Sequence, residues 1–298
     1  MNKDICIIIP HKGIGDVIFH CSFIGSISEY HKRKVILFVN SSTKANLIYQ
    51  NNKYVKKIFF IDLKRPQKIF YIFKIIKIIF ELCHHNIDKI YYTGNSKWHK
   101  IAFKSLSIIK KISLKNIYVK NKYIVSHLKD FLRREKINDL NSYDIQIKSK
   151  LRYNFINKIL SIKKPWVFLS IDTSEDQINI PNELLIKIIE KLKKKFNYIF
   201  VNTNQNNAYK TEFLKDRKII KTSQFNILEI LFIIKKSKLF IGNESGPAVL
   251  ASLNCRKSII FLNKNVRNET SKLPRMKKRK YLKISNIIKN NNIILNII

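Results

Sequence analysis

Short apolar runs, mostly of β-branched residues, alternate with amphipathic segments of helix length along nearly the whole chain. The runs that we predict to be strands are Ile5–Ile9, Lys34–Val39, Lys57–Ile61, Lys89–Tyr92, Asn116–Val119, Trp166–Ile171, Tyr198–Val201, Lys218–Ile220, Leu239–Ile241 and Ser258–Leu262. The segments that we predict to be helices include Asp16–Tyr30, Pro66–Cys83, Arg152–Ile162, Glu183–Phe196 and Asn226–Lys236. Because the strands show almost no polar alternation, they are typical of parallel sheets that helices cover on both faces.

The regular alternation weakens between Leu140 and Pro165, and a fresh strand opens at Trp166. We therefore predict two Rossmann-like domains, residues 1–150 and residues 151–298. Two parallel sheets that face one another would form a cleft at the carboxyl ends of their strands. The final segment Ile284–Ile298 is predicted to be one more helix, which could pack back across the first domain.

The composition says less about the fold and the function than the pattern of apolar and polar positions does. Hydrophobic residues make up 45% of the 298 residues, which excludes a disordered chain. The formal net charge of +38 favours an anionic partner. However, Lys, Ile and Asn dominate everywhere, as in an AT-rich coding sequence, so the charge says little about which partner. The four cysteines contain no CxxC pair and suggest no disulfide framework.

The first residues and the most apolar segment indicate where in the cell the protein lies. The first residues, MNKD, lead directly into the strand Ile5–Ile9 without the apolar core of a signal peptide. The segment Gln67–Cys83 contains three lysines and is typical of an amphipathic helix rather than a membrane span. We expect a soluble, cytoplasmic protein that could lie peripherally at the inner face of the cytoplasmic membrane. The basic run Arg275–Lys280 is predicted to be a solvated face.

The glycines mark the ends of strands. The chain has only six, and five of them follow predicted strands: Gly13, Gly15, Gly94, Gly242 and Gly246. Glycine at such a turn permits a positive φ and a close approach of the backbone to a ligand. Ordinary turn chemistry is the alternative.

The first candidate site is the turn His11-Lys12-Gly13-Ile14-Gly15-Asp16 after the first strand. It lacks the third glycine of a dinucleotide-binding GxGxxG motif. Asp16 either caps the helix that follows or acts as a general base, and both roles suit a carboxylate at a helix start.

The second candidate site is the turn after the strand Leu239–Ile241. Ser245 and Gly246 would expose backbone N–H groups at a helix start, and Pro247 fits the first turn of that helix. Such an end suits the phosphates of a nucleotide sugar, and Glu244 could accept hydrogen bonds from sugar hydroxyls. A plain turn with a cap is the alternative.

These motifs together resemble glycosyltransferase family 9, the ADP-heptose:lipopolysaccharide heptosyltransferases. The resemblance rests on Gly15-Asp16-Val17-Ile18, on Asn243-Glu244-Ser245-Gly246-Pro247-Ala248-Val249, and on Leu169–Ser174 with Ile180–Glu183, which is similar to the T-S…K-x-W-P segment of the family. Lys221-Thr222-Ser223 before a helix is also similar. The motifs follow the order of the family over most of the chain.

The resemblance implies a GT-B fold and metal-independent, inverting transfer of a heptose or related sugar to lipopolysaccharide or another cell-envelope glycan. It implies that Asp16 is the base and that Lys12, Gly13 and Gly15 lie on the acceptor side. The donor side implied is Thr173, Ser174, Thr222, Glu244, Ser245, Gly246 and Pro247. The donor would be a nucleotide sugar of the ADP type, the acceptor an anionic glycolipid, and neither a metal nor a nucleic acid is expected.

Three departures from the family motifs leave alternatives open. Val249 stands at the position of a histidine, and Ile178 or Gln177 with Ile180 stand where the family has its Lys and Trp. A GT-B transferase with a nucleotide hexose donor and a degenerate, non-catalytic family member are the alternatives. A nucleic-acid-binding protein is a third, but no motif of that class supports it.

Overall fold

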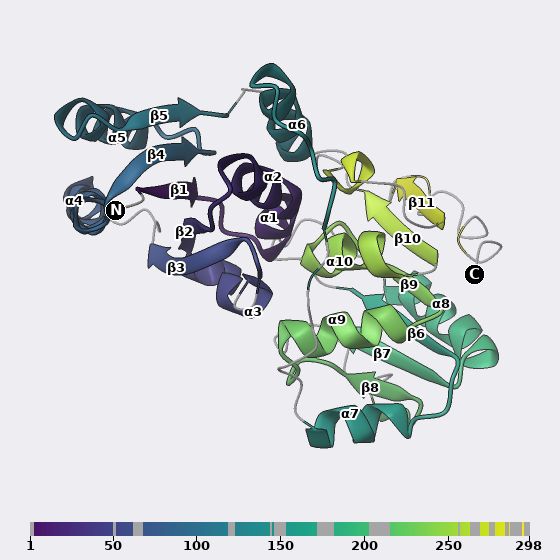
Figure 1. Ribbon diagram of the computed structural model, residues 1–298. Helices are drawn as coiled ribbons and strands as arrows, with labels where there is room; N and C mark the ends of the chain where they lie inside the picture. Colours follow the sequence, from purple (N-terminus) through teal and green to yellow (C-terminus); the bar gives the residue numbers. More distant parts are fainter. Residues whose placement is uncertain are drawn as a thin grey trace. The chain divides into compact units, whose positions relative to one another are not determined.

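The chain folds into two compact units, residues 1–146 and residues 147–298. In this computed structural model, the described residues are 3–49, 52–61, 68–118, 123–143, 145, 153–171, 182–202, 215–255, 257–262, 269–273, 278–283, 286 and 294. Each unit is a separate α/β structure (Figure 1).

The first unit is built on a five-stranded sheet in the order β3-β2-β1-β4-β5, and every strand pair is parallel. Its elements are β1 (Asp4–Ile9), α1 (Ile14–Phe19), α2 (Cys21–His31), β2 (Val35–Asn40), η1 (Ser41–Thr43), α3 (Ala45–Tyr49), β3 (Val55–Ile61), α4 (Lys68–His84), β4 (Ile87–Tyr92), α5 (Lys97–Ile109), β5 (Ser113–Asn116) and α6 (Ile124–Arg134). The apolar runs form the central strands because both of their faces are covered: every residue of β2 is buried.

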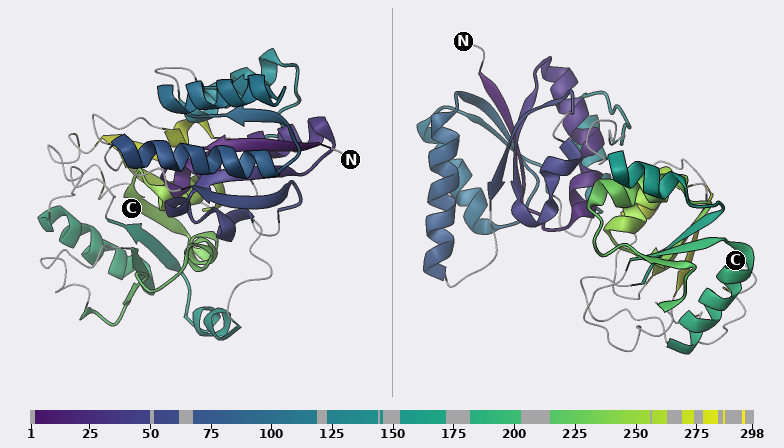
Figure 2. Two further views of the ribbon diagram at one scale, coloured as in Figure 1. Left: turned by 90° about the vertical axis from the view of Figure 1, so that its left-hand side faces the viewer. Right: turned by 90° about the horizontal axis from the view of Figure 1, so that it is seen from below.

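Helices cover the first sheet on both faces (Figure 2). On one face, α4 and α5 contribute Ile78, Leu82, Phe103 and Leu106 to a buried cluster with side chains of the central strands. On the other face, α1 and α2 pack with α6.

The second unit has a six-stranded sheet in the order β11-β10-β9-β6-β7-β8, again with every pair parallel. Its elements are α7 (Tyr153–Leu160), β6 (Trp166–Ser170), α8 (Asn182–Lys195), β7 (Tyr198–Asn202), β8 (Ile219–Lys221), α9 (Ile227–Lys236), β9 (Leu239–Asn243), α10 (Gly246–Asn254), β10 (Lys257–Leu262), η4 (Glu269–Lys272) and β11 (Lys278–Lys283). Phe168 in β6 pairs with Phe200 on one side and Phe240 on the other, so aromatic side chains fill the middle of this sheet.

The second core includes a residue from the C-terminal tail. Ile294 is completely buried in a cluster with α8 and the central strands of the second unit. The rest of the predicted helix Ile284–Ile298, except Asn286, lies outside the described residues.

The predicted fold class, two Rossmann-like parallel α/β units, is confirmed. Nine predicted strands match observed strands within about two residues, as is usual for element ends. The strand predicted at Asn116–Val119 is wrong, because β5 ends at Asn116 and Ile117 is buried beyond the ladder. The predicted helix Asp16–Tyr30 is broken into α1 and α2. The basic segment Lys278–Lys283 forms strand β11, which the prediction missed.

No helix in the described part of the chain is long and apolar enough to cross a membrane.

Candidate functional site

In both units the strand order reverses beside the first strand of the unit. β1 lies between β2 and β4, and β6 lies between β7 and β9. Ligands of doubly wound sheets bind outside the carboxyl ends of the strands at such a reversal. The turn after β1 holds Lys12 and Gly13, and Gly15 and Asp16 follow in the first turn of α1, so the candidate base lies at the reversal point of the first sheet.

Asp16 is the third residue of α1, and Gly13 is the residue that caps the helix. The Gly13 N–H donates to Asp16 Oδ2 over 3.0 Å, which is one half of a capping box. Gly13 has no side chain to return the second bond. Asp16 therefore does help to cap α1, but from a position three residues after the capping residue Gly13.

Gly13 also leaves room for the carboxylate. A Cβ added to Gly13 would lie 2.9 Å from Asp16 Oδ2, closer than side chains tolerate. A larger residue at this position would push the carboxylate away, so Gly13 is required for the placement of Asp16.

The surroundings of Asp16 suit a general base. Burial raises the pKa of the Asp16 carboxyl, and the nearby His11 charge and the Gly13 N–H partly oppose that effect. A carboxyl with a raised pKa is a stronger base than an exposed one once it has lost its proton.

His20 fixes the backbone of Asp16. Its Nδ1–H donates to the Asp16 carbonyl oxygen over 2.6 Å, while its own backbone N–H bonds to Val17. In a continuous helix, the Asp16 carbonyl would accept a hydrogen bond from the His20 backbone N–H. Here it accepts from the His20 ring instead, and α1 ends at Phe19. This competition explains the break in the predicted helix.

Two histidine rings lie beside this turn. The rings of His11 and His20 are 5.7 Å apart, and His20 is completely buried. Burial and the His11 charge lower the pKa of His20 well below its usual value, so the ring is neutral. The Nε2 atoms of both rings are buried and have no hydrogen-bond partner among the described residues. The predicted turn included His11 but gave it no role, and His20, four residues after Asp16, was not among the predicted site residues.

Polar residues after β2 hold the turn after β1. Ser42 Oγ donates to the Lys12 carbonyl over 2.8 Å, and Asn40 Oδ1 accepts from the Ser42 N–H over 3.1 Å. The polar run Asn40–Thr43 directly after the predicted strand Lys34–Val39 is the sequence signal for these residues, which were not among the predicted site residues.

Another buried histidine, His99 in α5, lies beside the last residue of β4. His99 Nδ1 lies 2.9 Å from the Tyr92 hydroxyl, and only 3% of His99 is exposed. Burial lowers the pKa of His99 from 6.5 to about 4.

This shift predicts a pH dependence of stability. Below pH 6.5 the unfolded chain binds a proton at residue 99 before the folded chain does, so the free energy of unfolding falls as the pH falls. The slope attributable to one such histidine is about 1.4 kcal/mol per pH unit between about pH 6 and pH 4.5. His99→Gln is expected to remove this slope in urea unfolding measured across that range.

The exposed His84 supplies the control for this prediction, because His84→Gln should leave the slope unchanged. Equal slopes in the wild type and in His99→Gln would contradict the assignment.

In the second unit, Gly242 brings β9 close to β6. A Cβ at Gly242 would lie 2.5 Å from the Ser170 carbonyl oxygen and 2.8 Å from Ser170 Cβ. None of the six glycines, all of which the structure describes, has a positive φ. The predicted positive φ is therefore wrong. The close approach at Gly242 is to a neighbouring strand, and a close approach of these turns to a ligand stays a prediction.

The turn after β9 presents the start of α10. Ser245 precedes the helix without a capping bond from its side chain, because Ser245 Oγ donates to the Asn243 carbonyl over 3.0 Å. Gly246 opens the helix and Pro247 is its second residue. The Ser245 side chain therefore makes no bond to the first turn of α10, while the Ser245 carbonyl accepts from the Val249 N–H. The N–H groups at the start of the helix are suited to bind an anion.

Two neighbours of this turn hold their places by hydrogen bonds. Glu244 Oε1 accepts from the Thr270 N–H over 3.0 Å. Asn243 Nδ2 donates to the Ile171 carbonyl over 2.6 Å, so it holds the end of β6 beside β9. Asn243 was not among the predicted site residues. Val249, at the position of the family histidine, is buried in the core.

Of the other predicted donor residues, the structure describes Thr222 but not Thr173 or Ser174. Thr222 is completely buried, and its hydroxyl donates to the Val201 carbonyl over 3.2 Å, so in this structure it holds β8 to β7 and is not presented to a ligand. Thr173 and Ser174 lie outside the described residues, as do Gln177, Ile178 and Ile180.

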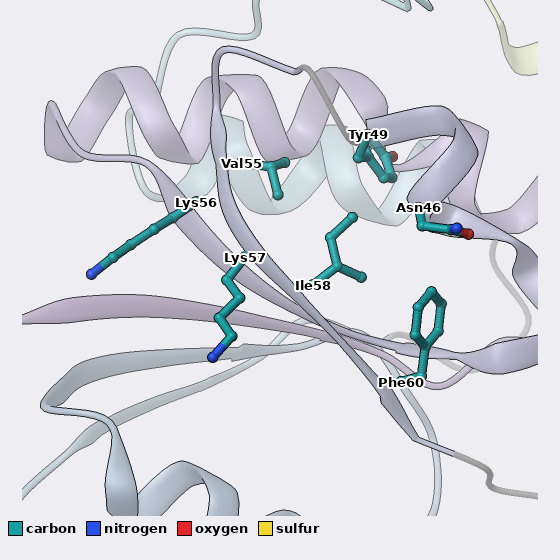
Figure 3. Close-up of a pocket in the computed structure, with 7 residues that line it drawn as sticks. All are labelled: Asn46, Tyr49, Val55, Lys56, Lys57, Ile58 and Phe60. Atoms are coloured by element: carbon teal, nitrogen blue, oxygen red, sulfur yellow. The ribbon is translucent and has the colours of Figure 1, made fainter. Parts of the chain in front are cut away.

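A hollow of about 330 Å³ lies at the edge of the first sheet beside α3 (Figure 3). It is lined by Asn46, Tyr49, Val55, Lys56, Lys57, Ile58 and Phe60. No predicted site residue is among them. The Tyr49 hydroxyl donates to the Val17 carbonyl over 2.6 Å, so this wall of the hollow is tied to α1.

Comparison with known proteins gives a result for structure alone. No family model and no curated protein matches the sequence. A glycosyltransferase of family 9 from Veillonella parvula is 11% identical, with a TM-score of 0.73 over 99% of this chain and 90% of that one. The Escherichia coli heptosyltransferase WaaC with ADP-2-deoxy-2-fluoro heptose is 13% identical, with a TM-score of 0.71 over 98% and 99% of the two chains.

A more distant likeness is to the UDP-GlcNAc 2-epimerase of Neisseria meningitidis bound to UDP-GlcNAc. It is 13% identical, with a TM-score of 0.57 over 99% of this chain and 92% of that one. At such identities the likeness establishes the fold, which is of the GT-B type.

Proposed function

We propose that this chain is an inverting glycosyltransferase of the family 9 type. It moves a heptose or related sugar from a nucleotide-sugar donor to lipopolysaccharide or another cell-envelope glycan. The observation that carries the proposal is the carboxylate of Asp16, held by Gly13 and His20 at the reversal point of the first sheet. The overall likeness to heptosyltransferase structures supports it.

The acceptor side of the reaction belongs to Asp16. Its carboxylate takes the proton from an acceptor hydroxyl, and the freed oxygen attacks the anomeric carbon of the donor. The bond from that carbon to the diphosphate breaks through an oxocarbenium-like state, and the nucleotide leaves with the bonding electron pair. Lys12, Gly13 and Gly15 form the turn that presents the base.

The donor side belongs to the start of α10. The backbone N–H groups at Ser245 and Gly246 are suited to the diphosphate, since a helix N-terminus stabilises the negative charge that grows on the leaving group. Thr173 and Ser174 would assist at the same phosphates, and Glu244 would bind a donor hydroxyl. The donor type proposed is an ADP-sugar, because the E. coli WaaC structure holds an ADP-linked heptose.

A thermal-shift panel tests the donor. ADP, ADP-sugars, UDP and UDP-GlcNAc are each added to the full chain, and a nucleotide that binds the folded state raises Tm. We expect ADP compounds to stabilise the chain more than the uridine compounds do. Stabilisation by UDP-GlcNAc alone would favour the alternative of a nucleotide-hexose donor. No stabilisation by any nucleotide would favour a degenerate, non-catalytic member.

We expect transfer to need no divalent metal. The proposed chemistry assigns the leaving-group charge to backbone N–H groups, and no carboxylate is given a metal-binding role. Transfer from the stabilising donor is measured with EDTA and with added Mg²⁺ or Mn²⁺. Activity should change less than about twofold, well below the usual contribution of a catalytic metal. Loss in EDTA with recovery on adding metal would overturn this part of the proposal.

A further inference from the structure

Two neighbouring helices of the first unit expose apolar side chains away from the sheet. α4 and α5 pack against each other and cover one face of the first sheet (Figure 2). Six large hydrophobic side chains lie on their outer sides, and we call this set the α4–α5 face. Its members and exposed fractions are Ile76 (53%), Phe80 (61%), Trp98 (64%), Ile101 (58%), Ile108 (69%) and Ile109 (75%).

Exposed large hydrophobic side chains are not spread evenly over the described surface. In the described part of the chain ten large hydrophobic side chains are exposed, and the α4–α5 face holds six of them. Scattered single exposures are normal in proteins, whereas gathered ones mark contact surfaces. The face therefore has the character of a contact surface.

The charges that α5 and the two residues after it place beside the face all have one sign, while the described side chains of α4 add one charge of each sign, Lys77 and the partly buried Glu81. Lys97–Lys111 contains five lysines and no Asp or Glu. At about 100° per residue, Trp98, Ile101, Ile108 and Ile109 fall within an arc of roughly 100° of α5. Lys97 and Lys104, both exposed, lie on the arc that adjoins it. Lys110 and Lys111 follow the helix and are also exposed.

We propose that the α4–α5 face binds the surface of an anionic lipid bilayer. A helix with Trp and Ile on one arc and lysines beside it is suited to lie in the interface, with apolar side chains in the acyl boundary and ammonium groups at lipid phosphates. A protein partner of matching shape would also cover the apolar side chains, but the five lysines of Lys97–Lys111, with no acidic residue among them, are complementary to a uniformly anionic surface. The inference goes beyond the proposed transfer reaction and does not depend on it.

Vesicle binding with a fluorescence readout tests the proposal on the full chain. The chain has two tryptophans, and Trp166 is completely buried while Trp98 is on the face. We expect co-flotation with phosphatidylcholine–phosphatidylglycerol vesicles and little with phosphatidylcholine alone. Lipids brominated in the acyl chain should quench Trp98 on binding. This readout needs no activity, so its failure and a failure of the transfer proposal are distinguishable.

Two variants separate the apolar contribution from the charge. The first variant, the triple serine variant, combines Trp98→Ser, Ile108→Ser and Ile109→Ser. It removes apolar area and keeps every lysine, and we expect it to bind anionic vesicles about tenfold more weakly or worse. The second variant combines Lys97→Gln, Lys104→Gln, Lys110→Gln and Lys111→Gln. It should also weaken binding to anionic vesicles by at least about tenfold. All these side chains are exposed, so Tm should not change.

The matched control lies in the second unit. Ile186 in α8 is 50% exposed, and the exposed Lys187 adjoins it. Ile186→Ser should bind anionic vesicles as the wild type does.

Equal binding by the triple serine variant and the wild type would overturn the proposal, because general positive charge would then explain the binding. Unquenched Trp98 in vesicle-bound protein would overturn it too. So would a wild-type dimer that the triple serine variant dissociates, since a second copy would then be the occupant.

Discussion

Asp16→Asn is expected to lower turnover by roughly two to four orders of magnitude, the usual contribution of a positioned base. The fold should survive, because the Asn amide oxygen can accept the hydrogen bond from the Gly13 N–H as Asp16 Oδ2 does. Loss of the negative charge in the first turn of α1 should cost at most about 1 kcal/mol. Affinity for the nucleotide should barely change, because Asp16 is assigned to the acceptor side. Turnover and urea unfolding of the same variant measure both quantities.

The chain provides a matched control for the capping contribution. Glu229 is the third residue of α9, and its Oε2 accepts from the Asn226 N–H over 2.9 Å, the same bond that Asp16 makes in α1. Glu229→Gln should keep turnover within about twofold, a change far below that expected for loss of a base. Asp16→Ala should cost about 1 kcal/mol of stability in addition to the loss of turnover. Wild-type turnover in a folded Asp16→Asn variant would leave Asp16 with the capping role alone.

Gly242→Ala is expected to lower the free energy of unfolding by about 1 to 3 kcal/mol, the usual cost of overpacking. The added Cβ would meet the Ser170 carbonyl oxygen at 2.5 Å, in the middle of the sheet. Backbone atoms of a central strand cannot move aside cheaply. The displacement should reach Asn243–Gly246, so nucleotide stabilisation in the thermal-shift panel should also decrease.

A second substitution identifies which atom opposes the new methyl group. Ser170→Gly removes the Cβ at 2.8 Å but leaves the carbonyl oxygen in place. The double variant should therefore recover little of the lost stability in denaturant unfolding. Full recovery would show that the side chain of Ser170, and not its backbone, sets the spacing between β6 and β9.

The fold could be predicted because one periodicity dominates both units. Strands buried on both faces appear as unbroken apolar runs, and Ile5–Ile9 and Trp166–Ile171 are almost free of polar residues. The edge strands were harder. β5 has the sequence SLKN and β11 the sequence KRKYLK, so their polar residues hid them from a search for apolar runs. Their strand structure comes from pairing with β4 and β10 rather than from local composition.

The candidate site could be predicted as a position but not as a geometry. Glycines after strands located both turns, since parallel sheets bind ligands there. The sequence could not show that the His20 ring would take the Asp16 carbonyl, because that bond depends on where α2 turns. It also could not show that the Thr222 hydroxyl would be used up inside the sheet. Both depend on neighbours brought close by folding.

Among the strands that the structure describes, four lie at sheet edges, namely β3, β5, β8 and β11. An edge strand can pair with the edge of another molecule, and lysine on the edge is a common natural defence against such aggregation. Three of these strands carry at least one exposed lysine: Lys56 and Lys57 in β3, Lys221 in β8, and Lys280 and Lys283 in β11. β5 and β8 are also short, with four and three residues. We therefore expect part of the large positive charge to keep copies of this isoleucine-rich chain from joining edge to edge, whatever its ligand is.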